Sequence, residues 1–345
     1  MGSTWNMSFR NHNQSQWFRN FVTPFFRIIE FVSVTSSYHI LFQENGPQLL
    51  NLSSEKAMAH KFGFHISISG GLEKAFARAK ELGCTTMQIF SRNPRGWRSA
   101  PLTQDQIEAW HREAASYSSI EPVVIHMPYL PNLAATKEDQ REKSYRSLTD
   151  ELRRAGALGI PYICTHVGKA MLADPAGQMK QVAQMCDQAL EETAADGITD
   201  PMLLLENTAG QGTEVGTRME ELGTILAHSK YAERYGICLD TCHAHAAGYD
   251  LSTETGLEQL IAEIEQFIGL DKIKVIHFND SMKPCGSRVD RHQHIGKGTI
   301  GEAGLRNILF HPVLRDLPFI METPENEEGN DAQNMATVLK LTMEA

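Results

Sequence analysis

The chain has 345 residues, of which 41% are hydrophobic and 21% charged, and its net charge is −10 at pH 7. This composition is typical of a soluble globular enzyme and excludes general disorder. The negative charge argues against a basic nucleic-acid-binding domain, so any contact with a polyanion has to be local or metal-mediated. Six cysteines without a C-x-x-C pair indicate reduced thiols in a cytoplasmic protein. No apolar run reaches membrane-spanning length.

Residues 1–57 differ from the rest of the chain, because they are rich in aromatic residues and poor in acidic ones. We expect them to form an N-terminal extension that is disordered, a tag or a mis-assigned start. An amphipathic presequence is the alternative. We expect a separate domain over residues 58–345.

From Phe62 onward, short apolar runs alternate with longer amphipathic stretches. The expected strands cover residues 62–67, 86–90, 122–126, 162–166, 202–206, 236–240, 274–277 and 319–322. The expected helices cover residues 71–82, 103–116, 138–158, 179–195, 219–228, 255–268, 302–309 and 330–343. Eight strand–helix units over about 285 residues predict an α/β fold of the (β/α)8 TIM-barrel type. A doubly wound open sheet is the alternative, but the first strand lacks a Gly-rich dinucleotide-binding turn.

Six successive predicted strands end in a residue that can bind a metal ion. In a barrel these ends converge on one rim, where such enzymes place their chemistry. Charged or imidazole groups at the mouth of an apolar barrel are costly unless they are paired or coordinated. The six residues are His126, His166, Glu206, Asp240, His277 and Glu322.

Three further groups are expected at the same rim, namely His243, Asp290 and His292. Nine nitrogen and oxygen ligands are too many for one zinc ion, which takes three or four protein ligands. The count therefore predicts a cluster of two or three metal ions. Such clusters suit hydrolysis, because the metals activate water and hold both oxygens of a phosphoryl transfer.

Two loops carry positive charge next to this rim. The loop over residues 281–301 is basic and Gly-rich, which favours contact with a phosphate backbone. A solvated surface loop is the alternative, but it does not explain Asp290 and His292. The loop over residues 91–98 places arginines beside Trp97, which suits a nucleic-acid groove or an unstacked base, with a plain turn as the alternative.

From about residue 64 to residue 322, the chain resembles endonuclease IV, the zinc-dependent apurinic/apyrimidinic endonuclease family of base-excision repair. The resemblance is carried by long, ordered motifs. They are the segment ENTAGQG over residues 206–212, DTCHAHAAGYD over 240–250, HFND over 277–280, GSRVDRH over 286–292 and HIGKGTIG over 294–301.

The resemblance implies a TIM barrel that holds three zinc ions. It places His126 and His166 on the first ion, Glu206 as the bridge to the second, Asp240, His277 and Glu322 on the second, and His243, Asp290 and His292 on the third. It also implies a monomer without a nucleotide cofactor.

The implied reaction hydrolyses the phosphodiester 5′ to an abasic site in duplex DNA and leaves a 3′-hydroxyl and a 5′-deoxyribose phosphate. In the implied mechanism, a hydroxide held by the metal pair that Glu206 bridges attacks in line, and the third zinc stabilises the leaving oxygen. Glu206 is therefore the implied catalytic residue. Arg95 and Tyr129 match positions that enter the minor groove, and Arg288 is a further expected DNA contact.

The sequence departs from the family pattern at some positions. Lys169 follows His166 where the family has Pro-Gly-Ser-His, which puts the phosphate contact there in doubt. His245 stands where an aromatic residue is common, and we expect it to be packed or to support a neighbouring ligand. We expect His65 to form a hydrogen bond with a metal ligand and not to bind the metal itself. We expect Cys242 to be a small packed residue.

Two other functions stay open at this point. A related barrel, a sugar isomerase or epimerase with one or two divalent metals, shares the rim histidines and carboxylates. The third ligand set and the arginine-bearing loops argue against it. A non-catalytic DNA-binding module is the other alternative, and it predicts binding without metal.

Overall fold

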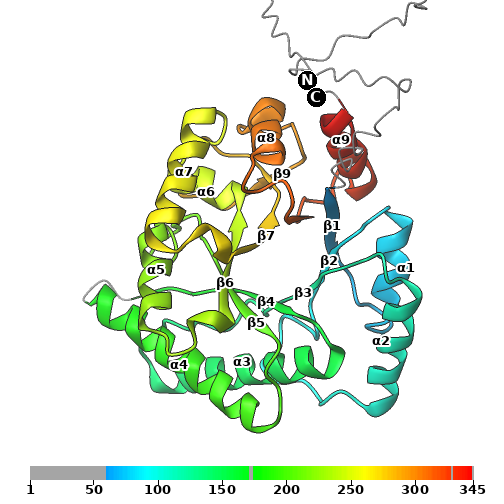
Figure 1. The fold of residues 1–345 in the computed structure, drawn as a ribbon, viewed down its shortest axis with the longest axis vertical. Coiled ribbons are helices and arrows are strands. Elements are labelled where there is room, and N and C mark those ends of the chain that lie inside the picture. Colours follow the sequence, from blue (N-terminus) through cyan, green and yellow to red (C-terminus); the bar gives the residue numbers. More distant parts are fainter. Residues whose placement is uncertain (1–59, 171–173, 328, 344–345) are drawn as a thin grey trace, which may run out of the picture. The chain divides into compact units, whose positions relative to one another are not determined.

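The computed structural model describes residues 60–170, 174–327 and 329–343. The N-terminal extension expected over residues 1–57 lies outside the described residues. The described chain closes eight parallel strands into a barrel in the order β1-β10-β7-β6-β5-β4-β3-β2, with helices around it (Figure 1). The expected TIM-barrel fold is confirmed.

The barrel strands lie within two residues of the expected positions. They are β1 (Lys61–Ile66), β2 (Met87–Ile89), β3 (Val123–His126), β4 (Tyr162–His166), β5 (Met202–Glu206), β6 (Tyr235–Asp240), β7 (Ile273–His277) and β10 (Pro318–Met321). The longer helices are α1 (Lys74–Glu81), α2 (Gln104–Ser116), α3 (Glu138–Leu158), α4 (Pro175–Ala195), α5 (Met219–His228), α7 (Glu254–Phe267), α8 (Gly301–Phe310) and α9 (Asp331–Met343). No helix of the described chain is long and apolar enough to cross a membrane.

Three local predictions were wrong or incomplete. The first helix begins at Lys74 and not at residue 71, because Gly70 (φ 84°) and Gly71 (φ 141°) have backbone angles outside the helical region. No helix was expected between residues 228 and 255, but Thr241–Ala247 form the short helix α6. Asp240 caps it by accepting a hydrogen bond from the backbone N–H of His243. The loop after β7 contains an antiparallel pair, β8 (Asp280–Ser281) and β9 (His292–Gln293).

The interior of the barrel contains one fully buried apolar layer. Each member of this layer lies two positions before one of the six rim residues predicted from the sequence. Because side chains alternate between the faces of a strand, residues two positions apart point to the same face. The rim residues therefore project into the barrel directly above this layer, which consists of Val124, Cys164, Leu204, Cys238, Val275 and Ile320.

Candidate metal centre and active site

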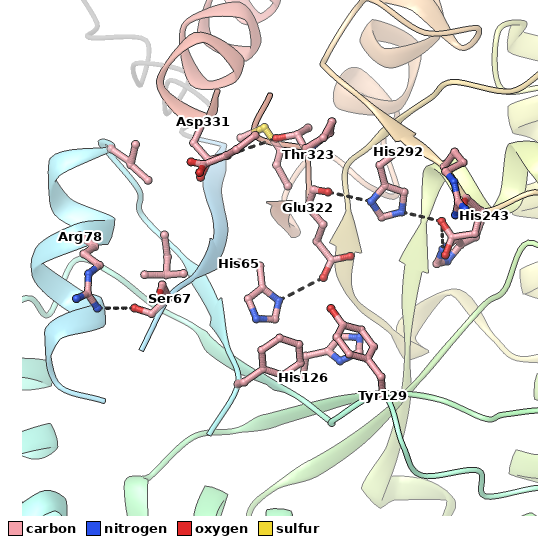
Figure 2. A pocket seen from close by; sticks show the side chains of 18 of the residues that line it. His65, Ser67, Arg78, His126, Tyr129, His243, His292, Glu322, Thr323 and Asp331 are labelled. Carbon is pink, nitrogen blue, oxygen red and sulfur yellow. Dashed lines mark hydrogen bonds and ion pairs between the residues drawn. The ribbon is translucent and has the colours of Figure 1, made fainter. Parts of the chain in front are cut away.

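Six of the nine predicted ligands line a cavity of about 690 Å³ at the C-terminal mouth of the barrel, namely His126, His166, His243, Asp290, His292 and Glu322. Figure 2 shows His65, His126, Tyr129, His243, His292 and Glu322 around this space. Glu206, Asp240 and His277 are fully buried at its base, whereas the side chains of His166 and Asp290 are 37% and 43% exposed. The centre is thus buried below and open to solvent above.

Glu206 lies at the middle of the cluster. Its Oε2 is 3.3 Å from His126 Nε2 and 3.4 Å from His166 Nε2. Its Oε1 is 3.0 Å from His277 Nδ1 and 3.3 Å from His243 Nδ1. One carboxylate therefore joins two pairs of imidazoles, which is the arrangement that a bridging ligand requires.

The hydrogen bonds of the histidines show which ring nitrogen carries the proton. His126 Nδ1 is 2.6 Å from the backbone oxygen of Met127, and His292 Nδ1 is 2.9 Å from the backbone oxygen of Glu322. A carbonyl oxygen can only accept, so both Nδ1 atoms donate and the lone pairs lie on Nε2. The lone pair of His126 then faces Glu206, and that of His292 lies 3.4 Å from Asp290 Oδ1 and 3.6 Å from Asp240 Oδ2.

Two further histidines follow the same rule. His243 Nδ1 lies 3.0 Å from the backbone oxygen of Asn207, to which it donates, which leaves the Nε2 lone pair 3.3 Å from Asp290 Oδ1. His277 Nε2 donates to the amide oxygen of Gln88 at 2.8 Å, so its Nδ1 lone pair faces Glu206.

Each ring nitrogen that faces a carboxylate oxygen needs positive charge between the two atoms, either a proton on the ring or a bound metal ion. His292 Nε2 is buried and has no hydrogen-bond partner among the described residues. Histidines whose far nitrogen is held by a carbonyl oxygen are typical metal ligands. The imidazole and carboxylate donor set fits zinc. The described residues therefore fit the metal centre that the sequence predicts.

The charges of the centre depend strongly on one another. Burial raises the pKa of Glu206, but the neighbouring His166 and His277 outweigh it and hold that pKa well below its usual range. Burial also raises the pKa of Asp290, but His243 and His292 lower it to about 2. Both carboxylates are therefore ionised at neutral pH, as metal ligands must be.

Two of the ligand sets that the family resemblance implies are compact in the structure, although His292 also forms a compact group with Asp240 and Cys242. His126, His166 and Glu206 form one set, and His243, Asp290 and His292 form another, each with donor atoms within 4.8 Å of one another. For the third set, His277 Nδ1 lies 3.3 Å from Glu322 Oε2 and 4.0 Å from Asp240 Oδ2.

Gln88 is a member of this site that the sequence analysis missed. It is fully buried on β2, and its amide nitrogen donates to Glu322 Oε1 at 2.7 Å and to His65 Nδ1 at 3.0 Å. Its oxygen accepts from His277, so one amide orients two predicted ligands. The sequence signal was a lone amide within an otherwise apolar strand. His65 Nδ1 also lies 3.4 Å from Glu322 Oε1, so this nitrogen either accepts from Gln88 or donates to Glu322.

We predict that Gln88→Met weakens zinc binding by about 10- to 100-fold, because it removes the hydrogen bonds that orient His277 and Glu322. Competition with a chromogenic chelator measures this affinity. Gln104→Met, which changes an exposed glutamine on α2, is the matched control. Equal zinc affinities for Gln88→Met and the unmodified chain would contradict the role given to Gln88.

The basic loop over residues 91–98 is only partly available for a ligand. Arg92 is 4% exposed, and its Nε donates to Glu151 Oε1 at 2.6 Å. Arg154 holds the same loop by donating to the backbone oxygens of Ser91 and Ala100. The interpretation of this loop as a nucleic-acid contact is therefore wrong for Arg92, whereas Arg95 is exposed.

The Gly-rich part of the loop over residues 281–301 is also used internally. The buried carboxylate of Asp280 accepts hydrogen bonds from the backbone N–H groups of Gly298, Ile300 and Gly301 at 2.9–3.4 Å. These amides are directed inward and are not free to bind phosphate. Arg288 is exposed but lines a separate cavity of about 260 Å³ beside Arg218.

Tyr129 stands at the mouth of the main cavity and is 69% exposed. Its ring packs edge-on against Phe90, with 5.3 Å between centroids, and lies 6.1 Å from the ring of His126. Lys169 pairs with Glu214 at 3.7 Å. Cys242 is buried, and its thiol contacts the backbone oxygen of Arg291 at 3.6 Å, in agreement with a packed residue.

The closed (β/α)8 barrel with histidines and carboxylates at its mouth places the protein among the TIM-barrel enzymes. Comparison with known protein families gives the same class. The model of the xylose isomerase-like TIM barrel family matches residues 76–342, so the chain belongs to that family.

Within that class, the chain belongs to the endonuclease IV family. It is 46% identical over 283 residues to a probable endonuclease 4 of Methanosphaerula palustris, which covers 82% of this chain and 98% of the relative. It is 47% identical over 279 residues to a probable endonuclease 4 of Methanoculleus marisnigri, covering 81% and 98%. The protein is therefore a hydrolase of the endonuclease type.

The solved structures show the same relationship. The crystal structure of endonuclease IV from Thermus thermophilus is 39% identical and has a TM-score of 0.73, covering 83% of this chain and all of that chain. A D-tagatose 3-epimerase-like protein is 20% identical with a TM-score of 0.60, which shows a shared fold alone.

Proposed function

We propose that this protein is a DNA-repair endonuclease that hydrolyses the phosphodiester 5′ to abasic sites in duplex DNA, leaving a 3′-hydroxyl and a 5′-deoxyribose phosphate. The relatives named endonuclease 4 support the nuclease activity. The observation that carries the proposal is the cluster of imidazoles around Glu206, Asp240 and Asp290, in which the buried Nε2 of His292 has no hydrogen-bond partner among the described residues. This donor set suits metal ions.

We assign three zinc ions to the nine residues, with Glu206 between the first two. Zinc supplies an activated water and neutralises charge on the attacking and leaving oxygens of a phosphodiester. The chain's own contribution is to hold its ligands in fixed orientations. The backbone oxygens of Met127, Asn207 and Glu322 and the amide of Gln88 each fix one imidazole.

The open mouth of the cavity suits a phosphodiester. His166 and Asp290 are the most exposed of the nine side chains, so substrate reaches the cluster on their side. Tyr129 and Arg95 are exposed beside this mouth and suit contact with the minor groove and the gap left by a flipped nucleotide. Extruding the sugar is least costly where no base is stacked, which favours abasic sites.

Nicking of a duplex oligonucleotide that carries a tetrahydrofuran abasic analogue tests this function. The zinc-loaded protein should cut 5′ to the analogue and leave an undamaged duplex intact, and metal content should be measured on the same sample. A sample with about three zinc ions per chain that leaves the analogue uncut would refute the proposed activity. Tight binding without metal would favour a non-catalytic module.

A further inference from the structure

A second group of metal-binding side chains lies outside the nine residues of the mouth. His245 is on α6, Asp250 follows that helix, and Cys285 is in the loop between β8 and β9. One ring nitrogen of His245, a carboxylate oxygen of Asp250 and the sulfur of Cys285 lie within 4.8 Å of one another. The closest nitrogen–oxygen distance joins His245 Nδ1 and Asp250 Oδ1 at 4.0 Å.

The hydrogen bonds of Thr299 determine the protonation of His245. Thr299 Oγ1 is 2.6 Å from the backbone oxygen of Lys283, which can only accept, so the single hydroxyl proton is used there. The same oxygen lies 3.2 Å from His245 Nε2 and must accept a hydrogen bond from it. Nε2 therefore carries the ring proton of the neutral imidazole, and the lone pair lies on Nδ1.

The lone pair on Nδ1 has no partner. His245 is 1% exposed, and its Nδ1 is buried without a hydrogen bond among the described residues. It faces the carboxylate of Asp250, which adds repulsion to the cost of an unsatisfied buried atom. A cation bound between the two groups removes both costs.

The same geometry excludes a Cys–His–Asp catalytic triad. Such a triad needs the thiol and the carboxylate on opposite ring nitrogens. Here Thr299 occupies Nε2, and the carboxylate approaches Nδ1. The three side chains are therefore better suited to binding a metal ion than to nucleophilic catalysis.

We propose that His245, Asp250 and Cys285 bind a divalent cation of borderline softness such as zinc. Imidazole, carboxylate and thiolate are zinc donors, whereas magnesium and calcium prefer oxygen ligands. Donor atoms that share one zinc lie roughly 3.5 Å apart. The donor atoms of His245, Asp250 and Cys285 therefore have to move slightly closer to one another. The Asp250 side chain is 48% exposed, but its Oδ1 accepts hydrogen bonds from the backbone N–H and the hydroxyl of Ser252 at 3.2 and 2.5 Å. The approach therefore falls mainly on Cys285, which is exposed. Binding breaks the S–H bond of Cys285, forms a metal–sulfur bond and releases the proton to solvent.

The bound cation clamps the end of α6 to the loop that carries Arg288 and Asp290. This loop already contacts α6 through two backbone hydrogen bonds, from Gly286 to His245 at 3.0 Å and from Arg288 to Ala246 at 2.9 Å. The site is separate from the main centre, so its presence does not depend on the proposed nuclease activity.

Protection of Cys285 from alkylation tests the site, because Cys285 is the one exposed cysteine among the described residues. The full chain is stripped with a chelator and treated with iodoacetamide while zinc is added, and peptide mass spectrometry follows Cys285. Zinc should slow alkylation by about ten-fold or more, because the bound thiolate is not a free nucleophile. Chelator should restore the rate.

Two variants separate this site from the main centre. Asp250→Asn should abolish the protection, whereas His166→Gln, which alters the main centre, should keep it. Unchanged protection in Asp250→Asn, or its loss in His166→Gln, would overturn the proposal.

Cobalt gives a second measurement that does not depend on reaction rates. The nine residues of the main centre include no cysteine, so a thiolate-to-cobalt absorption band reports cobalt at a sulfur ligand. The band should appear in the unmodified chain and in Cys242→Ser and be absent in Cys285→Ser. Its absence from the unmodified chain, or an undiminished band in Cys285→Ser, would show that Cys285 binds no metal.

Discussion

Glu206→Gln should reduce the rate of abasic-site cleavage by about 10³-fold or more. The neutral amide removes the negative charge between two pairs of imidazoles, and its nitrogen cannot serve as a bridging ligand. Binding of the abasic duplex should change little, because Glu206 is fully buried and does not reach the rim surface where DNA would lie. Single-turnover nicking and fluorescence anisotropy measure the two quantities separately.

The control for this variant is Glu108→Gln, which alters an exposed glutamate on α2 and should cleave normally. Metal content should be determined for both proteins. Near-normal turnover in Glu206→Gln would show that the bridging role is wrong, and loss of DNA binding in parallel with cleavage would point to misfolding.

Arg92→Ala should lower the free energy of unfolding by about 3–5 kcal/mol, the usual cost of removing one partner from a buried ion pair. Arg92 and Glu151 are both almost inaccessible, with side chains 2% and 0% exposed and 2.6 Å between Nε and Oε1. The variant leaves the carboxylate of Glu151 buried with Ser91 as its remaining side-chain partner. Urea unfolding followed by circular dichroism measures the loss.

Arg146→Ala is a matched control, because Arg146 on α3 pairs with Glu142 at the same 2.6 Å but at the surface, with side chains 74% and 52% exposed. Exposed pairs contribute about 0–1 kcal/mol, so this variant should unfold almost as the parent does. If both variants lost the same free energy of unfolding, burial would not be the reason that the Arg92–Glu151 pair stabilises the fold.

The decrease in the free energy of unfolding caused by Arg92→Ala should also depend on pH. Burial raises the pKa of Glu151 and outweighs the opposing contacts with Ser91 and Arg92. A carboxyl group whose pKa is raised on folding favours the folded state at low pH, and this contribution declines as pH rises above the unfolded pKa. Removal of Arg92 raises the pKa of Glu151 further. The destabilisation should therefore be smaller at pH 5 than at pH 8.

The strands and the ligand cluster could be predicted from the sequence because one physical rule produces both. An apolar residue and a ligand two positions later share the inner face of a strand, as Cys164 and His166 do on β4. Repeated on neighbouring strands, this pattern places the six strand-end ligands on one rim. The rule does not apply to α6, whose limits come from the Asp240 cap and from Gly248 (φ 119°) rather than from apolar periodicity.

The contacts that could not be predicted join residues far apart in the sequence. Gln88 meets His277 across 189 positions and Glu322 across 234, so no local pattern shows that this amide orients two ligands. Arg92 was misinterpreted for the same reason. The residue that makes it internal is Glu151 on α3, 59 positions away, and the loop sequence alone does not distinguish Arg92 from the exposed Arg95.

The apolar layer beneath the ligands also determines how the centre exchanges with its surroundings. Its six side chains are fully buried, so ions and water reach the ligands from the open side of the cavity, past His166 and Asp290. On the proposed function, the same opening receives the DNA. A bound duplex would therefore cover the route by which metal ions leave, and chelators should strip the enzyme more slowly while DNA is bound.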